Sequence, residues 1–176
     1  MAQSYSGNYR TVCVAALKRA ALTVALVALA TPAMAQSAGP GLVGVWKITG
    51  WEAKTAAQVA RIYGDHPGGY FLFSPGGHFM FTMVGNNREG LSKGLMTDAD
   101  MVTLFRTMSA LDGTYNVQGS DKFVIHVEHS WNQLWTGTDQ HREFAINGNS
   151  LSVTFKTKNE RTGDDLLVTV SAERAE

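Results

Sequence analysis

The side chains best suited to chemistry lie on two predicted strands in the second half of the sequence. His126 and Glu128 are two residues apart, so they project from one face of a strand, roughly 7 Å from each other. On the next strand, Gln140 and Arg142 share a face with Phe144. If these faces point inward, five polar side chains meet inside the folded domain: Tyr115, His126, Glu128, Gln140 and Arg142.

Arg142 gives this set of side chains several possible roles. Its guanidinium can hold the carboxylate of a ligand through two parallel hydrogen bonds. Alternatively, Arg142 pairs with Glu128 in an ion pair that only stabilises the fold. An enzyme would use His126 as a general base, Glu128 to orient it and Arg142 to stabilise an oxyanion, with Tyr115 as a further catalytic candidate. Nothing in the spacing marks a nucleophile, so binding is favoured over catalysis.

Three histidines near these positions raise the question of a metal site. His126 and His129 are an odd number of residues apart, so a regular strand directs them to opposite faces. His141 is out of phase with Arg142 and is expected to face solvent. We therefore predict no dedicated metal site and no cofactor.

The elements that must position these side chains are mostly short strands in which apolar and polar residues alternate. Turn sequences separate them, such as Ser74-Pro75-Gly76-Gly77 and Asn147-Gly148. The predicted strands cover residues 43–53, 70–74, 78–84, 113–117, 122–128, 137–146, 151–157 and 166–172. We predict an all-β fold, an eight-stranded up-and-down antiparallel barrel with one short helix, because closure removes the edge strands.

The one predicted helix interrupts this pattern in the middle of the sequence. Thr97-Asp98 offers an N-cap. Apolar residues then recur at the three- and four-residue spacing of a helix face: Met101, Leu104, Phe105 and Met108. Two placements of this helix are open, either over an open end of the barrel or packed against its outside.

Aromatic residues suggest how the barrel is closed and lined. Gly44 permits a close backbone approach and Trp46 is large enough to plug one barrel end, so both are predicted to be structural. Tyr70 and Phe81, in the aromatic hairpin of residues 70–84, either line a pocket or pack in the core. Trp131 and Trp135 either form a portal at a barrel mouth or cap the core.

The first 35 residues have the order of a cleavable secretory signal peptide. Lys18-Arg19 precede an apolar run over residues 20–30, and Ala33-Met34-Ala35 matches a cleavage site. A permanent membrane anchor is the alternative, but the run is too short to span a bilayer, so no stable membrane span is expected after cleavage. Residues 36–41 form a flexible lead-in, and residues 42–174 form the barrel domain. The protein is therefore expected to be secreted, and periplasmic in a double-membraned host.

The charge and the cysteine content exclude some classes of partner and covalent cross-link. Removal of the signal takes away Arg10, Lys18 and Arg19, which leaves 12 of 15 basic and all 15 acidic residues, a formal charge of −3. No basic surplus remains to displace counterions from nucleic acid, so nucleic acid is not a predicted partner. The single cysteine, Cys13, leaves with the signal, and the remaining chain has no disulfide.

A set of short sequences occurs in order over nearly the whole domain, at residues 44–46, 69–79, 113–115, 126–128, 137–144 and 147–151. This ordered set resembles the bacterial lipocalin-like domain family, a branch of the calycin superfamily. The resemblance implies an eight-stranded barrel around a small-molecule cavity, and it implies no activity.

Together, these observations predict a barrel that binds a small hydrophobic or amphipathic molecule. The predicted ligand-binding residues are Arg142, Gln140, Tyr115, His126, Glu128, Tyr70 and Phe81. A small barrel enzyme, such as an isomerase, cyclase or hydratase using the same polar cluster, is the first alternative. An interaction module with a fully packed barrel is the second.

Overall fold

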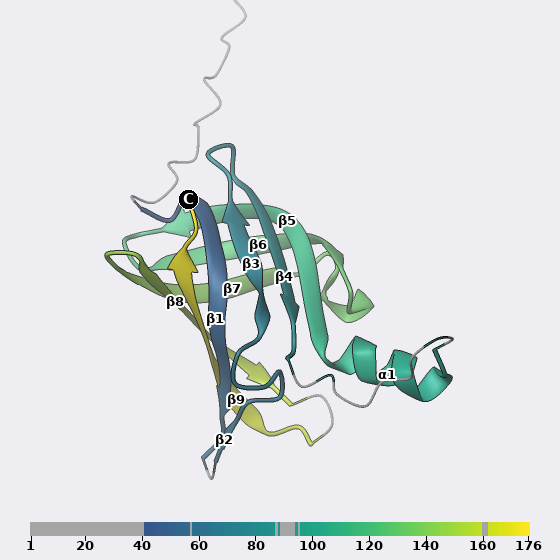
Figure 1. Ribbon diagram of the computed structural model, residues 1–176. Helices are drawn as coiled ribbons and strands as arrows, with labels where there is room; N and C mark the ends of the chain where they lie inside the picture. Colours follow the sequence, from purple (N-terminus) through teal and green to yellow (C-terminus); the bar gives the residue numbers. More distant parts are fainter. Residues whose placement is uncertain (1–40, 57, 87, 89–93, 95, 160–161) are drawn as a thin grey trace, which may run out of the picture. The chain divides into compact units, whose positions relative to one another are not determined.

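The computed structural model describes residues 41–176 apart from residues 57, 87, 89–93, 95 and 160–161 (Figure 1). The predicted signal peptide and all of the lead-in before Gly41 lie outside the described residues. Within the described residues, no helix is long and apolar enough to cross a membrane.

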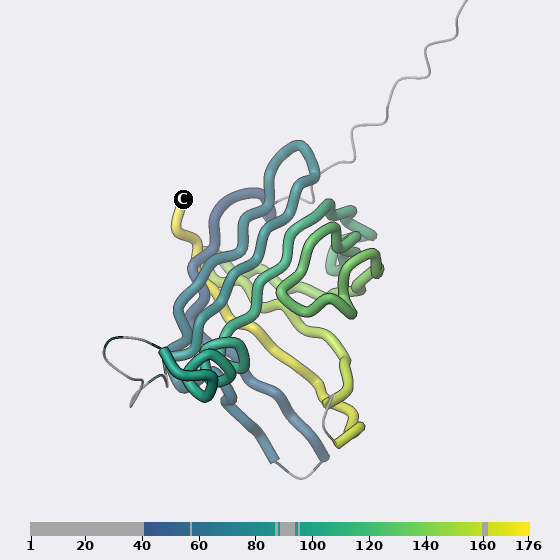
Figure 2. The backbone as a smooth tube through the Cα atoms, turned by 90° about the vertical axis from the view of Figure 1, so that its right-hand side faces the viewer, coloured from purple at the N-terminus to yellow at the C-terminus, as the bar shows by residue number. Residues whose placement is uncertain are grey.

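A single antiparallel sheet curls into a closed barrel (Figures 1 and 2). From β3 to β9, strands that are consecutive in the sequence are neighbours in the sheet, and the first strand also pairs with the last, which closes the cylinder. The two-residue β2 pairs only with the end of β1, so eight strands form the wall. The strands are β1 Gly44–Lys54, β2 Val59–Ala60, β3 Gly68–Phe73, β4 His78–Val84, β5 Met108–Gln118, β6 Lys122–Ser130, β7 Asp139–Asn147, β8 Ser150–Lys158 and β9 Asp165–Arg174. The predicted fold class is confirmed.

Alternation of apolar and polar residues decides which face of each strand points inward. In β1, Trp46 and Ile48 are buried while Lys47 and Thr49 are exposed, as the sequence predicts. The β1–β9 register then shifts between Ile48 and Gly50. This irregularity changes the phase of the strand, so that Trp51 is buried on the far side of it.

One end of the barrel is closed by Trp46, which is completely buried. Its indole Nε1 donates a hydrogen bond to the Leu42 carbonyl at 2.9 Å, and the Arg174 guanidinium stacks 4.1 Å from its ring centroid. Gly44 has a φ of 136°, and a Cβ there would lie 2.7 Å from Arg174 Nη1. The glycine is therefore needed where the chain passes beneath this arginine.

The helix lies near the opposite end of the barrel from the C-terminus (Figure 1). Helix α1 spans Asp98–Arg106, and Thr97 caps it through a capping box with Asp100, which confirms the predicted N-cap. The expectation that Met108 belongs to the helix is wrong, because Met108 begins β5 and pairs with Val84. β5 thus starts five residues before the predicted strand. A single 3₁₀ turn, η1, covers Gln133–Trp135 between β6 and β7.

Candidate ligand cavity

The barrel holds a cavity of about 1370 Å³, and its lining reaches α1 through residues such as Met101 and Phe105. Its wall is mainly aromatic and aliphatic, and the aromatic part includes Trp51, Phe71, Phe79, Phe81, Phe123 and Phe155. A fully packed interior, one of the sequence-based alternatives, is therefore wrong. A largely apolar hollow with few polar groups is the usual character of a small-molecule site.

Two of the predicted polar residues line this cavity. The burial pattern of β7 alternates so that Gln140, Arg142 and Phe144 turn inward, while His141 and Glu143 are exposed. Both Gln140 and Arg142 belong to the cavity wall. The strand phase inferred from Phe144 is thus correct for both side chains.

Arg142 is held by groups of its own strand and by one aromatic ring. Its Nη1 donates to the His141 carbonyl at 2.9 Å, and its Nη2 donates to Gln140 Oε1. The guanidinium carbon lies 3.9 Å from the ring centroid of Phe155 on β8. Desolvation lowers the pKa of Arg142 to about 10, which still leaves it protonated at neutral pH.

No ion pair among the described residues includes Arg142. The alternative in which Glu128 neutralises Arg142 inside the barrel is wrong, because Glu128 is exposed. The guanidinium therefore brings a positive charge to the cavity wall that no described carboxylate offsets within 4 Å.

His126 and Glu128 lie on the outer wall, so the expected five-residue polar cluster does not form. The opposite face of β6 carries Phe123, Ile125 and Val127, which are the more apolar set and are at most 2% exposed. His126 instead contacts Asp139 across the strand pair, with Nδ1 and Oδ1 2.8 Å apart. A general base at His126 would face solvent, away from the cavity.

A β-bulge adds a second histidine to the outer wall. Asp112 pairs with His129 and Gly113 pairs with Val127, so Glu128 is the extra residue. Both Glu128 and His129 are exposed, and the expectation that His126 and His129 lie on opposite faces is wrong.

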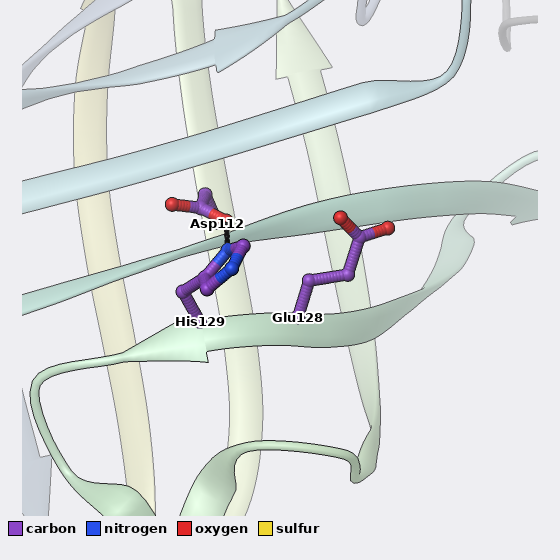
Figure 3. Close-up of side chains that lie close together, drawn as sticks. All are labelled: Asp112, Glu128 and His129. Atoms are coloured by element: carbon purple, nitrogen blue, oxygen red, sulfur yellow. Dashed lines mark hydrogen bonds and ion pairs between the residues drawn. The ribbon is translucent and has the colours of Figure 1, made fainter.

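The bulge brings three potential metal ligands together outside the barrel. One ligand atom from each of Asp112, Glu128 and His129 lies within 4.8 Å of the other two. Figure 3 shows the His129 ring hydrogen-bonded to the Asp112 carboxylate, with the Glu128 carboxylate beside them. The hydrogen bond that the His129 ring donates to the Asp112 carboxylate raises the pKa of His129, and the negative charge of Asp112 acts in the same direction. The prediction of no dedicated metal site stays a prediction.

The remaining predicted ligand-binding residues take three different positions. Phe81 lines the cavity and stacks on Phe71 at a centroid distance of 5.0 Å. Tyr115 points inward but is absent from the cavity wall, and its hydroxyl donates to the Ser74 carbonyl at 2.9 Å. Burial raises the pKa of this hydroxyl. Tyr70 is on the outer face of β3 and is 46% exposed, so its expected pocket position is wrong.

Aromatic residues from separate segments meet at the cavity mouth. Phe105 of α1 lies 4.4 Å from Trp131, and Trp131 lies 6.0 Å from Trp135, as measured between ring centroids. Trp131 is fixed by a hydrogen bond from Nε1 to Ser109 Oγ at 2.9 Å. All three rings line the cavity, which favours the portal over the core cap and places α1 beside the mouth.

Some cavity residues were not singled out from the sequence as part of a site. Trp51 was missed because the irregularity in β1 shifts its phase. Phe155 was missed because its contact with Arg142 depends on the exact cross-strand register of β7 and β8. Ser109 was missed because β5 begins earlier than predicted.

A comparison with known families gives one match over most of the domain. The family model described as a lipocalin-like domain matches residues 43–174. No curated protein matches the chain.

Proposed function

This chain belongs to the lipocalin-like domain family, and we propose that its barrel binds a small apolar or amphipathic molecule in the cavity, with Arg142 as the polar anchor. The observation that carries the proposal is a guanidinium on the wall of a mainly apolar cavity with no described carboxylate within 4 Å. A ligand with an apolar body and an acceptor group fits both parts of this wall.

The energetics of the arginine favour an anionic group on that ligand. Taking a guanidinium out of water costs on the order of several kcal/mol unless an anion or strong acceptors replace the water. The His141 carbonyl and the Gln140 amide oxygen supply acceptors but no negative charge. A bound anion would supply it, which is why Arg142 is the proposed anchor.

The residues that the enzymatic alternative needs as its general base and orienting group lie outside the cavity. His126 and Glu128, the proposed base and its orienting group, are exposed on the outer wall. No other observation favours catalysis, so we retain binding as the proposed function.

We also propose that the protein is exported after cleavage behind Ala35. The charged, apolar and small-residue order of residues 1–35 supports this. Amino-terminal sequencing of protein recovered from its host tests it: a start at Gln36 is expected, and a start at Met1 would contradict export by cleavage.

Binding in the cavity can be tested with a fluorescent probe, undecanoic acid carrying a terminal dansyl group. Direct excitation of the dansyl group should show saturable enhancement with one site per chain. Leu111→Trp fills the cavity from a buried lining position, whereas Met80→Trp adds the same ring on the exposed face of β4. We expect Leu111→Trp to weaken binding about tenfold or more, because the ring occupies the ligand's volume.

The Met80→Trp variant is the matched control and should bind like the unaltered protein. Absence of saturable binding, or equal affinity in both variants, would contradict a ligand site inside the barrel.

A further inference from the structure

Most N–H donors of Arg142 have no hydrogen-bond partner among the described residues. A guanidinium carries five N–H donors. Two are used here, by the His141 carbonyl and by Gln140 Oε1, which leaves three. The stacking of Arg142 on Phe155 fixes the plane in which these remaining donors lie.

Gln140 has a defined orientation because Arg142 can only donate. The amide oxygen of Gln140 must face the guanidinium, so its amide nitrogen faces away from it. No hydrogen bond from this nitrogen is found among the described residues. The Gln140–Arg142 pair therefore has several N–H donors without a partner among the described residues, and it carries a single net positive charge.

Few charged residues line the cavity, and their exposure to solvent differs. The other formally charged residues that line the cavity are exposed: Arg106, Asp139, Lys156 and Lys158. In the described part of the chain, Arg142 is thus the one charged lining residue that is not exposed. One desolvated positive charge is balanced by one negative charge, and a dianion would leave an excess charge in an apolar surrounding.

We propose that the Gln140–Arg142 pair selects ligands with a singly charged oxyanion head, of which a carboxylate is the simplest, over neutral and doubly charged analogues. This inference rests on the proposed function and adds the charge class of the ligand. It also assigns a role to Gln140: a neutral side chain at this position holds Arg142 by an acceptor oxygen without neutralising it. A carboxylate at position 140 would have the same shape and would occupy the guanidinium permanently.

The decisive variant is Gln140→Glu, which is nearly isosteric. The affinity of each protein is measured for dansylated undecanoic acid and for its methyl ester, with dodecanoic acid and dodecyl phosphate as competitors. In the unaltered protein the acid should bind about tenfold or more tightly than the ester, since charged hydrogen bonds are lost in the ester. Dodecanoic acid should compete better than dodecyl phosphate, which is mostly doubly charged at pH 8.

In Gln140→Glu the preference for the acid over the ester should vanish, because the new carboxylate pairs with Arg142 and repels the anionic head of the acid. Ala145→Glu is the matched control, because it adds the same charge to an exposed position on β7 and should keep the preference. Arg142→Met is a second route to the same result and should also abolish the preference, because the positive charge is removed. Thermal unfolding of each variant checks that the barrel is intact.

The outcomes separate the two proposals. Equal binding of acid and ester by the unaltered protein, or a preference that survives in Gln140→Glu, would overturn the charge selection while ligand binding stands. Tighter competition by dodecyl phosphate than by dodecanoic acid would overturn the single charge. If neither probe binds, the proposed function itself fails.

Discussion

Two arginines stack on aromatic rings in this barrel, one at the closed end and one in the cavity. Arg174 lies 4.1 Å from the ring centroid of Trp46, and Arg142 lies 3.9 Å from that of Phe155. Their hydrogen bonds differ. Arg174 donates to carbonyls near both ends of the domain, including those of Gly41 and Val43. Within the described part of the chain, Arg142 donates only to groups of β7.

This difference separates a structural arginine from one suited to a ligand. Arg174 joins the segment before β1 to the end of β9 and lies over the tryptophan that closes the barrel. Removal of its side chain would leave backbone carbonyls without their donors. Arg142 joins no distant segments among the described residues, and its described neighbours satisfy only part of its donors. Each region can therefore be disturbed with little effect on the other.

The closed end should give the largest loss of stability. Trp46→Ala removes a completely buried side chain that contacts Arg174 and donates to Leu42. We expect the free energy of unfolding to fall by about 3–5 kcal/mol, the usual cost of removing a large aromatic side chain from a core. Denaturant unfolding measures it, and a loss under about 1 kcal/mol would contradict the role of Trp46 as the barrel's plug.

The two arginines should respond oppositely to the same substitution. Arg174→Met should lower the free energy of unfolding by about 1–3 kcal/mol, because carbonyl acceptors lose their donors. Arg142→Met should leave that free energy unchanged or raise it, because it removes a desolvated charge that no described residue neutralises. Parallel denaturant curves test this, and equal destabilisation by both variants would show that Arg142 is structural too.

The outer wall should give the smallest effect. The folded-state pKa of His129 is raised by Asp112, so the pair adds stability below the unfolded-state pKa of about 6.5. That contribution is lost as the pH rises through the higher folded-state pKa. NMR titration should place the His129 pKa above 6.5, and Asp112→Asn should lower it. The same pKa in both proteins would show that Asp112 does not cause the shift.

The sequence predicted those parts of the barrel in which strands keep a strict period of two. In β7 the alternation is clear, and Gln140 and Arg142 have the predicted orientations. The Gly44–Trp46 spacing also predicted the closed end, because glycine permits a close backbone approach and the indole is large enough to plug the barrel.

The wrong sequence-based placements come from features that the alternation of residues along a strand does not reveal. The irregularity after Ile48 and the bulge at Glu128 each change the phase of a strand, which hid Trp51 and misplaced His129. His126 was misplaced for another reason: its strand has two partly apolar faces, and the burial of Phe123, Ile125 and Val127 decides between them. The cavity mouth depends on contacts between distant segments, such as Phe105 with Trp131.

A crystal structure of the protein with bound dansylated undecanoic acid tests the central claim most directly. We predict that the hydrocarbon chain lies inside the barrel and that the carboxylate lies within hydrogen-bonding distance of the Arg142 guanidinium. A probe bound on the outer wall, or one inside the barrel with its carboxylate directed away from Arg142, would contradict the account.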